Sequence, residues 1–358
     1  MKRLSMLILS VFAISSLFTS AIAQMPDLKV SAYVDSYYAT DNDNGRMGSR
    51  LFSYVNNTKD EFGLNIGQIS VSADTEHYYG KVTFHTGDLA GSAIPGMIQE
   101  AYAGFKFTDK FTVDAGYFLT HIGGEALLPK DNWLSSHSLV TFYEPFYHAG
   151  VRFGYQFSQN FGAQLHILNG NGIFRDNNMN KTLGWYLAYN NDNETFTLSY
   201  AGLLGNEAPG SPNNAQTHMY HNVCAGLKLS DNFETKAQFD FASLEDGTRD
   251  DDGELTAGSF MGASLQGRYH FSKMANATLR VAYIDDSDAI YGEDWKHFTG
   301  LGVTLGAEYK PVENGYIRLE GRMISLSGDD DRGKIFYDGD ELTNSRMEVM
   351  LNFGVYLD

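Results

Sequence analysis

Cysteine and proline are nearly absent from this sequence. Cys224 is the only cysteine among 358 residues, so no disulfide can form within the chain. Only seven prolines interrupt the chain, whereas 37 glycines and 14% aromatic residues are typical of many strands joined by tight turns. Beyond residue 23 there is no run of about 18 apolar residues, the length that a membrane-spanning helix needs. If the rest of the chain crosses a membrane, strands have to do so.

Positive charge is also scarce. The chain has 26 Lys and Arg against 44 Asp and Glu, a formal net charge of -18. Nucleic acid is therefore excluded as a partner, because its phosphates require a basic surface. The acidic residues gather at 245–254, 285–294 and 329–331, which we expect to be solvated loops. None of these stretches follows the calcium-loop pattern, and His218 and His221 lack a nearby carboxylate or thiolate, so we predict no metal site and no cofactor.

Residues 1–23 have the pattern of a secretory signal. Lys2 and Arg3 precede an apolar body that ends on the small residues of Ala21-Ile22-Ala23. This arrangement predicts a cleavable signal peptide, with the mature chain beginning at Gln24. An uncleaved membrane anchor is the alternative, but no stop-transfer pattern follows the segment and no cysteine offers a lipidation site there.

From Leu28 onward, segments of about ten residues alternate apolar with polar side chains, and the connections between them alternate short with long. This predicts an all-β fold, a transmembrane antiparallel β-barrel of about sixteen strands over residues 24–358, with short periplasmic turns and long extracellular loops. A barrel of that size pairs every backbone group without an exposed edge and encloses an aqueous channel. A soluble propeller is the alternative, but its blades pack four short strands into each repeat, where this chain has two long ones. The long connections are expected near residues 41–60, 88–97, 120–145, 170–181, 205–220, 245–256, 286–297 and 327–343.

The longest connection, residues 120–145, is too long for an ordinary hairpin, and loops of that length are usually functional or disordered. Its Leu127, Leu128, Trp133 and Phe142 favour a folded loop. The window contains Gly123-Gly124-Glu125, then Pro129-Lys130-Asp131-Asn132-Trp133, and then Pro145-Phe146-Tyr147-His148-Ala149-Gly150-Val151-Arg152. These motifs resemble those of the OmpL-like putative beta-barrel porin family of bacterial outer membranes.

The resemblance implies a multi-pass β-barrel in the outer membrane, with outer-membrane lipid, lipopolysaccharide and the outer-membrane assembly machinery as partners. Residues 346–358 alternate apolar with polar side chains and resemble the C-terminal assembly signal of such barrels, although the chain ends on Asp358 and not on an aromatic residue. Monomer and homotrimer both remain open, because lipid-facing and protomer-facing strands look alike in one sequence.

If the apolar face of each strand meets lipid, the polar face lines the lumen, and its wall carries basic and acidic residues in nearly equal number. We expect the loop of residues 120–145 to fold inward, so that Glu125 and Asp131 oppose wall arginines and set up a transverse field at a constriction. The alternative is that these arginines pair with Glu308, Glu320 or Glu348 on neighbouring strands and only stiffen the wall. The acidic loops around the mouth favour cations weakly. The residues assigned to the constriction and lumen are Glu125, Asp131, Asn132, Arg152, Arg268, Arg280, Arg318, Arg322, Glu308 and Glu320.

The predicted function is that of a porin, which allows passive diffusion of small hydrophilic solutes or ions through the narrowed barrel. A surface-exposed binding or adhesion barrel with a closed lumen and acidic working loops is the alternative, and a channel selective for one nutrient class is a third possibility. We predict no enzyme, because the only cluster that suggests a nucleophile and base, Ser135-Ser136-His137-Ser138, shows no orienting partner.

Overall fold

The computed structural model describes residues 27–44, 50–178, 180–207, 216–249, 254–290, 298–328 and 333–357. The predicted signal peptide, residues 1–23, lies outside these described residues. Sixteen antiparallel strands form one closed barrel, as predicted from the alternation of side chains. The strands are β1 (Asp27–Asp41), β2 (Phe62–Asp74), β3 (Tyr78–Thr86), β4 (Ile98–Lys106), β5 (Phe111–Leu119), β6 (Tyr147–Gln156), β7 (Phe161–Leu168), β8 (Thr182–Asn190), β9 (Phe196–Asn206), β10 (Thr217–Ser230), β11 (Phe233–Arg249), β12 (Leu255–His270), β13 (Ala275–Asp286), β14 (Phe298–Val312), β15 (Gly315–Ser327) and β18 (Ser345–Leu357).

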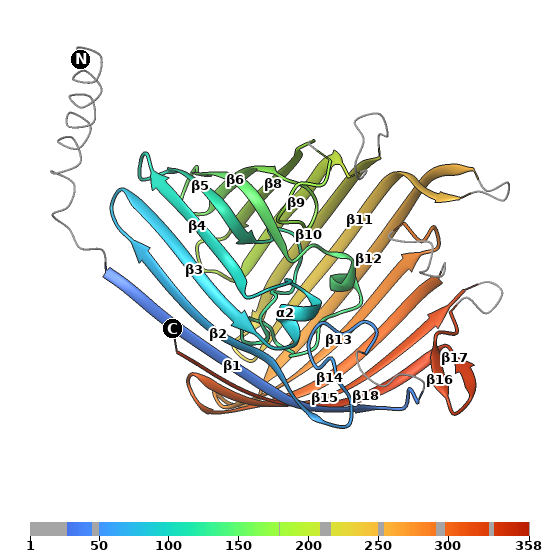
Figure 1. Ribbon diagram of the computed structural model, residues 1–358. Coiled ribbons are helices and arrows are strands. Elements are labelled where there is room, and N and C mark those ends of the chain that lie inside the picture. Colours follow the sequence, from blue (N-terminus) through green and yellow to red (C-terminus); the bar gives the residue numbers. More distant parts are fainter. Residues whose placement is uncertain are drawn as a thin grey trace, which may run out of the picture.

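The first and last strands close the barrel. β1 pairs with β18 in a register that runs from Ala32 opposite Leu357 to Asp41 opposite Glu348. In Figure 1 the blue β1 accordingly lies beside the dark red β18. Every other strand pairs with its neighbours in sequence, except that β15 pairs with β18 across the small hairpin of β16 (Phe336–Asp338) and β17 (Glu341–Thr343). Closure leaves the barrel without an unpaired edge. A protein that crosses lipid with strands requires this, because its backbone groups find no partners in the lipid.

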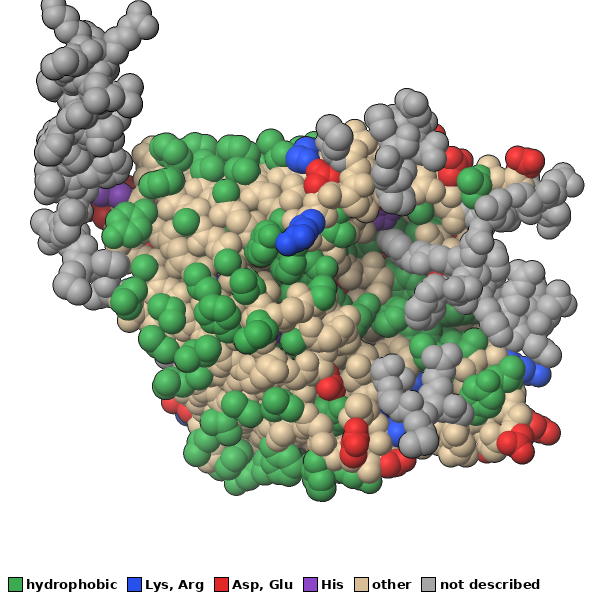
Figure 2. Space-filling model, in the orientation of Figure 1, with side chains coloured by type: hydrophobic (Ala, Val, Ile, Leu, Met, Phe, Trp, Pro, Cys, Tyr) green, Lys and Arg blue, Asp and Glu red, His purple; other side chains and the backbone are tan. Residues whose placement is uncertain are grey.

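Alternation with period two decides which side chains face outward. On β18, Met347 and Val355 are 60% and 64% exposed, whereas the intervening Glu348 and Asn352 are buried inside the barrel. The same alternation on the other strands produces an outward band of exposed apolar side chains, which Figure 2 shows in green over the face in view. At the short turns, aromatic rings such as Phe107 and Phe157 are exposed and pack on Phe111 and Phe161 across the turn. Such rings are expected where hairpins leave a bilayer.

Within the described ranges, helical structure is confined to short pieces in the long connections. They are the helix α2 (Asp88–Ser92) and the 3-10 turns η1 (Pro129–Asp131) and η2 (Val140–Tyr143). None of the helices in the described ranges is both long enough and apolar enough to span a membrane.

Two predicted loop boundaries differ from the structure. Residues 245–256 were expected to be a loop, but β11 continues to Arg249 and β12 begins at Leu255, with Thr248 opposite Thr256. Glu245 and Asp246 fall at the register shift between Leu244 and Thr248. The expected connection 327–343 likewise contains the β16–β17 hairpin.

Apolar side chains fill part of the interior, beside the polar side chains that the alternation places there. At the long-loop ends of the strands, Leu203, Tyr220, Phe260, Ile284 and Ile324 are buried in one cluster. The loop side chains that pack into this cluster are Ile122, Leu139, Val140 and Tyr143. Burying such a side chain contributes about 1.5–3 kcal/mol, so these wall positions hold the connections inside the barrel.

Candidate functional site

The connection between β5 and β6, residues 120–146, is folded inside the barrel. Every residue from Asn132 to Thr141 is buried. The segment has little regular structure, so its backbone carbonyl and N–H groups need partners other than one another. The barrel wall supplies several of those partners, and three charged wall residues, Arg280, Arg318 and Glu320, bind six of the backbone groups of the loop.

Arg280 on β13 holds the loop most directly. Its Nη1 lies 2.7 Å from Oε1 of Glu125 and donates to the carbonyl oxygen of Ser136 at 2.6 Å, while its Nη2 donates to the carbonyl of His137 at 3.0 Å. Glu125 also accepts bonds from Gln266 Nε2 at 2.9 Å and from the Ser138 N–H at 2.6 Å. Burial alone would raise the pKa of the Glu125 carboxyl, but Arg280, His137 and the Ser138 N–H outweigh it and place that pKa below its usual range.

Arg318 and Glu320 on β15 hold the neighbouring part of the loop. Arg318 donates to the carbonyl oxygens of Pro129 at 2.7 Å and Asn132 at 2.8 Å. Glu320 accepts bonds from the backbone N–H groups of Ser135 and Ser136 and from Ser136 Oγ at 2.6 Å. One strand thus satisfies both donors and acceptors of the loop.

The remaining predicted wall residues form ion pairs with neighbouring strands. Glu308 on β14 accepts from Arg318 Nε at 2.6 Å and from Arg268 Nη2 at 2.7 Å. Arg322 lies 3.7 Å from Glu348 and donates to the carbonyl of Phe52 at 3.0 Å. On the other side of the barrel, Arg152 pairs with Asp114 at 3.1 Å. The wall arginines therefore both pair with carboxylates of the wall and hold loops.

Two predicted constriction residues lie elsewhere. Asp131 does not oppose a wall arginine, because its half-exposed carboxylate accepts a bond from Lys130 Nζ at 3.0 Å. Asn132 is buried, and its side-chain amide pairs with both backbone groups of Ala126, at 2.8 and 2.7 Å. The side chain of Asn132 thus fixes the conformation of the loop and does not face the lumen.

A second group of contacts was missed from the sequence. Glu144, at the far end of the loop, accepts a hydrogen bond from Gln238 Nε2 on β11. The N–H of Gly124 donates to Gln238 Oε1 at 3.1 Å, and Asn222 Nδ2 donates to Asp240 Oδ1 at 2.6 Å. Burial raises the pKa of Glu144 well above its usual value, and the charges of Asp240 and Glu125 raise it further. The Gly123-Gly124 pair was the available signal, because it marks a close approach of backbone to wall.

Three histidines meet where the loop leaves β5. The ring centroids of His121 and His166 are 4.0 Å apart, and those of His121 and His148 are 5.3 Å apart. Burial lowers the pKa of His121 to about 4, although its Nε2 lies 3.2 Å from the carbonyl of Gly202. Among the described residues, no group of three His, Cys, Asp or Glu is arranged to hold a metal ion. His221 pairs with the Tyr200 hydroxyl at 2.8 Å.

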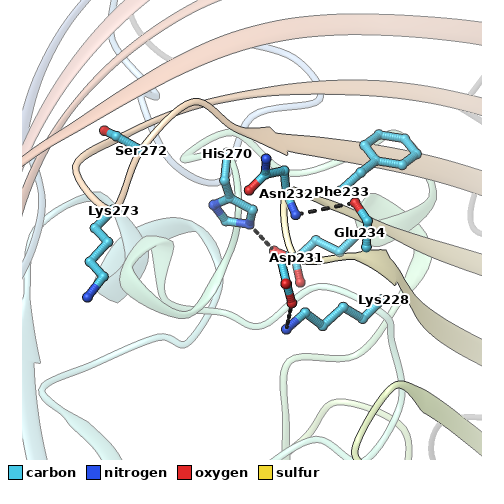
Figure 3. A pocket seen from close by; sticks show the side chains of 9 residues that line it. Lys228, Asp231, Asn232, Phe233, Glu234, His270, Ser272 and Lys273 are labelled. Carbon is cyan, nitrogen blue, oxygen red and sulfur yellow. Dashed lines mark hydrogen bonds and ion pairs between the residues drawn. The ribbon is translucent and has the colours of Figure 1, made fainter.

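Cavities lie on both sides of the loop. One of about 220 Å³ is lined by Gly123, Gly124, Cys224 and Lys236 among others, and one of about 370 Å³ is lined by Tyr54 and by residues 142–147. A cavity of about 560 Å³ lies between the short turns after β10 and β12. Figure 3 shows this third cavity with His270 bonded to Glu234 and Lys228 paired with Asp231. The loop contributes lining residues to the first two cavities.

A sixteen-stranded antiparallel barrel with an apolar outer band and a loop folded into its lumen has the architecture of a porin. The family described as "Putative beta-barrel porin-2, OmpL-like" matches residues 27–357, and the chain belongs to that family. It is a multi-pass β-barrel of the outer membrane, with its short turns on the periplasmic side and its long loops on the extracellular side.

Solved outer-membrane channels share this fold at low sequence identity. The anion-selective porin of Comamonas acidovorans has a TM-score of 0.61 at 10% identity, over 93% of this chain and 100% of that chain. The outer-membrane channel DcaP of Acinetobacter baumannii has a TM-score of 0.62 at 12% identity, over 92% and 97% of the two chains. OprB of Pseudomonas putida has a TM-score of 0.59 at 11% identity, over 92% and 94%. A comparison with curated proteins gives no match.

Proposed function

We propose that the protein is a diffusion channel for small hydrophilic solutes or ions, and that residues 120–146 form its constriction. The observation that supports this most directly is that Arg280, Arg318 and Glu320 bind the loop across the barrel interior. A loop held at several points by buried charges keeps a fixed position, which a constriction of constant size requires.

The charges along the path favour cations. The chain has a formal net charge of -18, and Glu144 in the loop and Asp240 on β11 both accept a bond from Gln238. Acidic mouths raise the local concentration of cations within about 8 Å of the surface at physiological salt. The Comamonas porin is described as anion-selective, but a likeness at 10% identity concerns the fold and not these charges.

Single-channel conductance in a planar bilayer tests the proposal. Refolded protein should give stable current steps, and a variant lacking residues 125–140 should give larger ones. In a salt gradient the reversal potential should have the sign of cation preference. Silence from both proteins, in samples shown to be folded, would reject a diffusion channel, and equal steps from both would reject the loop as the constriction.

A surface-exposed binding or adhesion barrel with a closed lumen is the second candidate. The apolar cluster favours it, because Leu139, Val140 and Tyr143 pack against wall residues and occupy interior volume. The deletion variant separates the two candidates, since a closed barrel is silent when intact and conducts when the loop is removed.

We propose further that residues 1–23 are removed on export and that residues 24–358 form the barrel, which N-terminal sequencing of the membrane-embedded protein tests. Lipopolysaccharide, outer-membrane lipid and the assembly machinery are the expected partners, and no enzymatic activity is proposed. One solved barrel of the same fold, OmpT of Vibrio cholerae, is described in a trimer form at 12% identity. Crosslinking in native membranes would separate a homotrimer from a monomer here.

A further inference from the structure

The extracellular cavity of about 370 Å³ has an unusual lining. Four long connections contribute to it, together with β6 and β13. No Lys, Arg or His is among the lining residues that the structure describes. The aromatic and acidic residues that line it are Tyr54, Phe142, Tyr143, Phe146, Tyr147, Glu144 and Asp286.

The aromatic walls are fixed in place by contacts of their own. The ring of Tyr54 stacks on Phe142 with centroids 5.0 Å apart and meets the edge of Phe146 at 4.6 Å. The Tyr54 hydroxyl donates to the Phe142 carbonyl at 3.0 Å, and Ser92 Oγ donates to the Tyr54 carbonyl at 2.8 Å. The rings therefore do not need to be ordered when a ligand enters, which favours binding.

Glu144, on the acidic side of the cavity, has no basic partner among the described residues. Within the part of the chain that the structure describes, no ion pair joins Glu144, or Asp240 next to it, to a Lys, Arg or His. Both carboxyl groups are buried, with Glu144 6% and Asp240 0% exposed. Burying a carboxylate without a cation is costly, and a bound cation would remove most of that cost.

The rings decide which kind of cation suits the cavity. Calcium and magnesium take six or more oxygen ligands, which aromatic walls do not supply. An alkylammonium group is attracted to ring faces and does not require such a shell, and cages of aromatic rings are a common way to bind quaternary ammonium ions. The volume of about 370 Å³ also suits a small organic molecule.

We propose that this cavity binds a small organic cation of the alkylammonium class, with Tyr54, Phe142 and Phe146 around the cationic group and Glu144 as its counter-charge. The proposal rests on the proposed channel function only in that the cavity would then lie on the permeation path. Binding itself requires no current.

Protonation of Glu144 provides a second signature. Asp240 on β11 and Glu125 in the same loop carry charge of the same sign as Glu144 and face it. Burial raises the pKa of the Tyr54 phenol, and the charge of the nearby Glu144 raises it further. A cation that binds beside Glu144 favours the ionised carboxylate and so releases a proton from it. Affinity should therefore rise with pH through the raised pKa of Glu144.

The test is calorimetric titration of refolded full-length protein in detergent at a series of pH values above about 5, with choline as the probe. Its uncharged isostere dimethylbutanol, in which carbon replaces nitrogen, is the matched control ligand. We expect choline to bind at least tenfold more tightly than the isostere and to release protons, detected as a heat that depends on the buffer. Equal binding of the two ligands by the wild-type protein would overturn the proposal without any variant.

Variants then locate the site. Glu144→Gln should weaken choline binding about tenfold and abolish proton release, Phe142→Leu should weaken binding with proton release intact, and Asp131→Asn, in the same loop but outside the cavity, should change neither. Choline binding unchanged in Glu144→Gln would place any binding elsewhere and reject the site. Binding without conductance would reject the channel function alone, and conductance without choline binding would reject this inference alone.

Discussion

Arg280 on β13 and Glu125 in the loop between β5 and β6 form an ion pair of 2.7 Å in which both side chains are almost wholly buried, 1% and 3% exposed. The two residues are far apart in sequence, so the pair exists only when the barrel has closed around the loop. Removing one partner of such a pair leaves a buried charge uncompensated, which costs about 3–5 kcal/mol. The position of the loop therefore depends strongly on this contact.

Replacing Arg280 by methionine should release the loop from the wall. We expect an increase in single-channel conductance and a loss of about 3 kcal/mol in the free energy of unfolding, because Glu125 and two loop carbonyls lose their donor. Arg152→Met is the matched control, since Arg152 pairs with Asp114 on the adjacent strand. Equal conductance in the two variants would show that the loop does not depend on Arg280.

Glu144→Gln should change how stability depends on pH. The pKa of Glu144 is raised by burial and then by Asp240, so its contribution to stability is present below the ordinary pKa of a glutamate and is lost as pH rises through the raised pKa. As pH rises from about 5 through the raised pKa of Glu144, the variant should lose less stability than the wild type, as measured by urea unfolding in detergent. Asp131→Asn controls for loss of a carboxylate from the same loop. Parallel pH profiles for wild type and Glu144→Gln would contradict the assignment.

Gly123→Ala should disturb the loop by contact with Glu144. A Cβ at Gly123 would lie 2.5 Å from Glu144 Oε2, and the backbone there has φ of +110°. Gly96→Ala is a useful control, because Gly96 has φ of +96° but no heavy atom within 4 Å of the added Cβ. Both variants carry a backbone cost of about 1 kcal/mol, and only Gly123→Ala should also alter the conductance. If Gly96→Ala altered conductance equally, backbone strain and not the clash would be responsible.

The barrel could be predicted from the sequence because strand alternation is a local property. Met347 and Glu348 face opposite sides whatever the rest of the chain does, and sixteen such segments with alternating connections define a closed even-stranded sheet. Local patterning was misleading where a strand is apolar on both faces. Ile324 and Phe260 follow the strand alternation and face inward, where loop side chains share their cluster.

The loop contacts could be predicted only in part. The composition of the window suggested that Glu125 would oppose wall arginines. Which arginine it contacts depends on the path that the loop takes into the barrel, and the sequence does not give that path. Arg318 donates to backbone carbonyls of the loop, and the pattern of side chains in a sequence does not predict which carbonyls accept a bond. Glu144 and Gln238 are joined only through tertiary structure, so the pair was absent from the sequence interpretation.

Trp133 offers a way to observe the loop without measuring current. Its ring lies 4.5 Å from Lys236 Nζ, and the side chain is only 8% exposed. In a background where Trp185 and Trp295 are replaced by phenylalanine, Trp133 should be protected from acrylamide quenching. Lys236→Met removes a cation–π contact of about 1 kcal/mol and should raise quenching slightly, whereas Arg280→Met should raise it strongly because the loop leaves the wall.

Lys228→Met, at the periplasmic end of β10, is the control for a lost lysine, since Lys228 pairs with the exposed Asp231. Quenching and conductance report the same event by independent means. If Arg280→Met raises conductance while Trp133 stays protected, the wall has rearranged and the loop has not moved. If both rise together, the loop is the element that sets the width of the passage, because the only step common to the two signals is its release from β13.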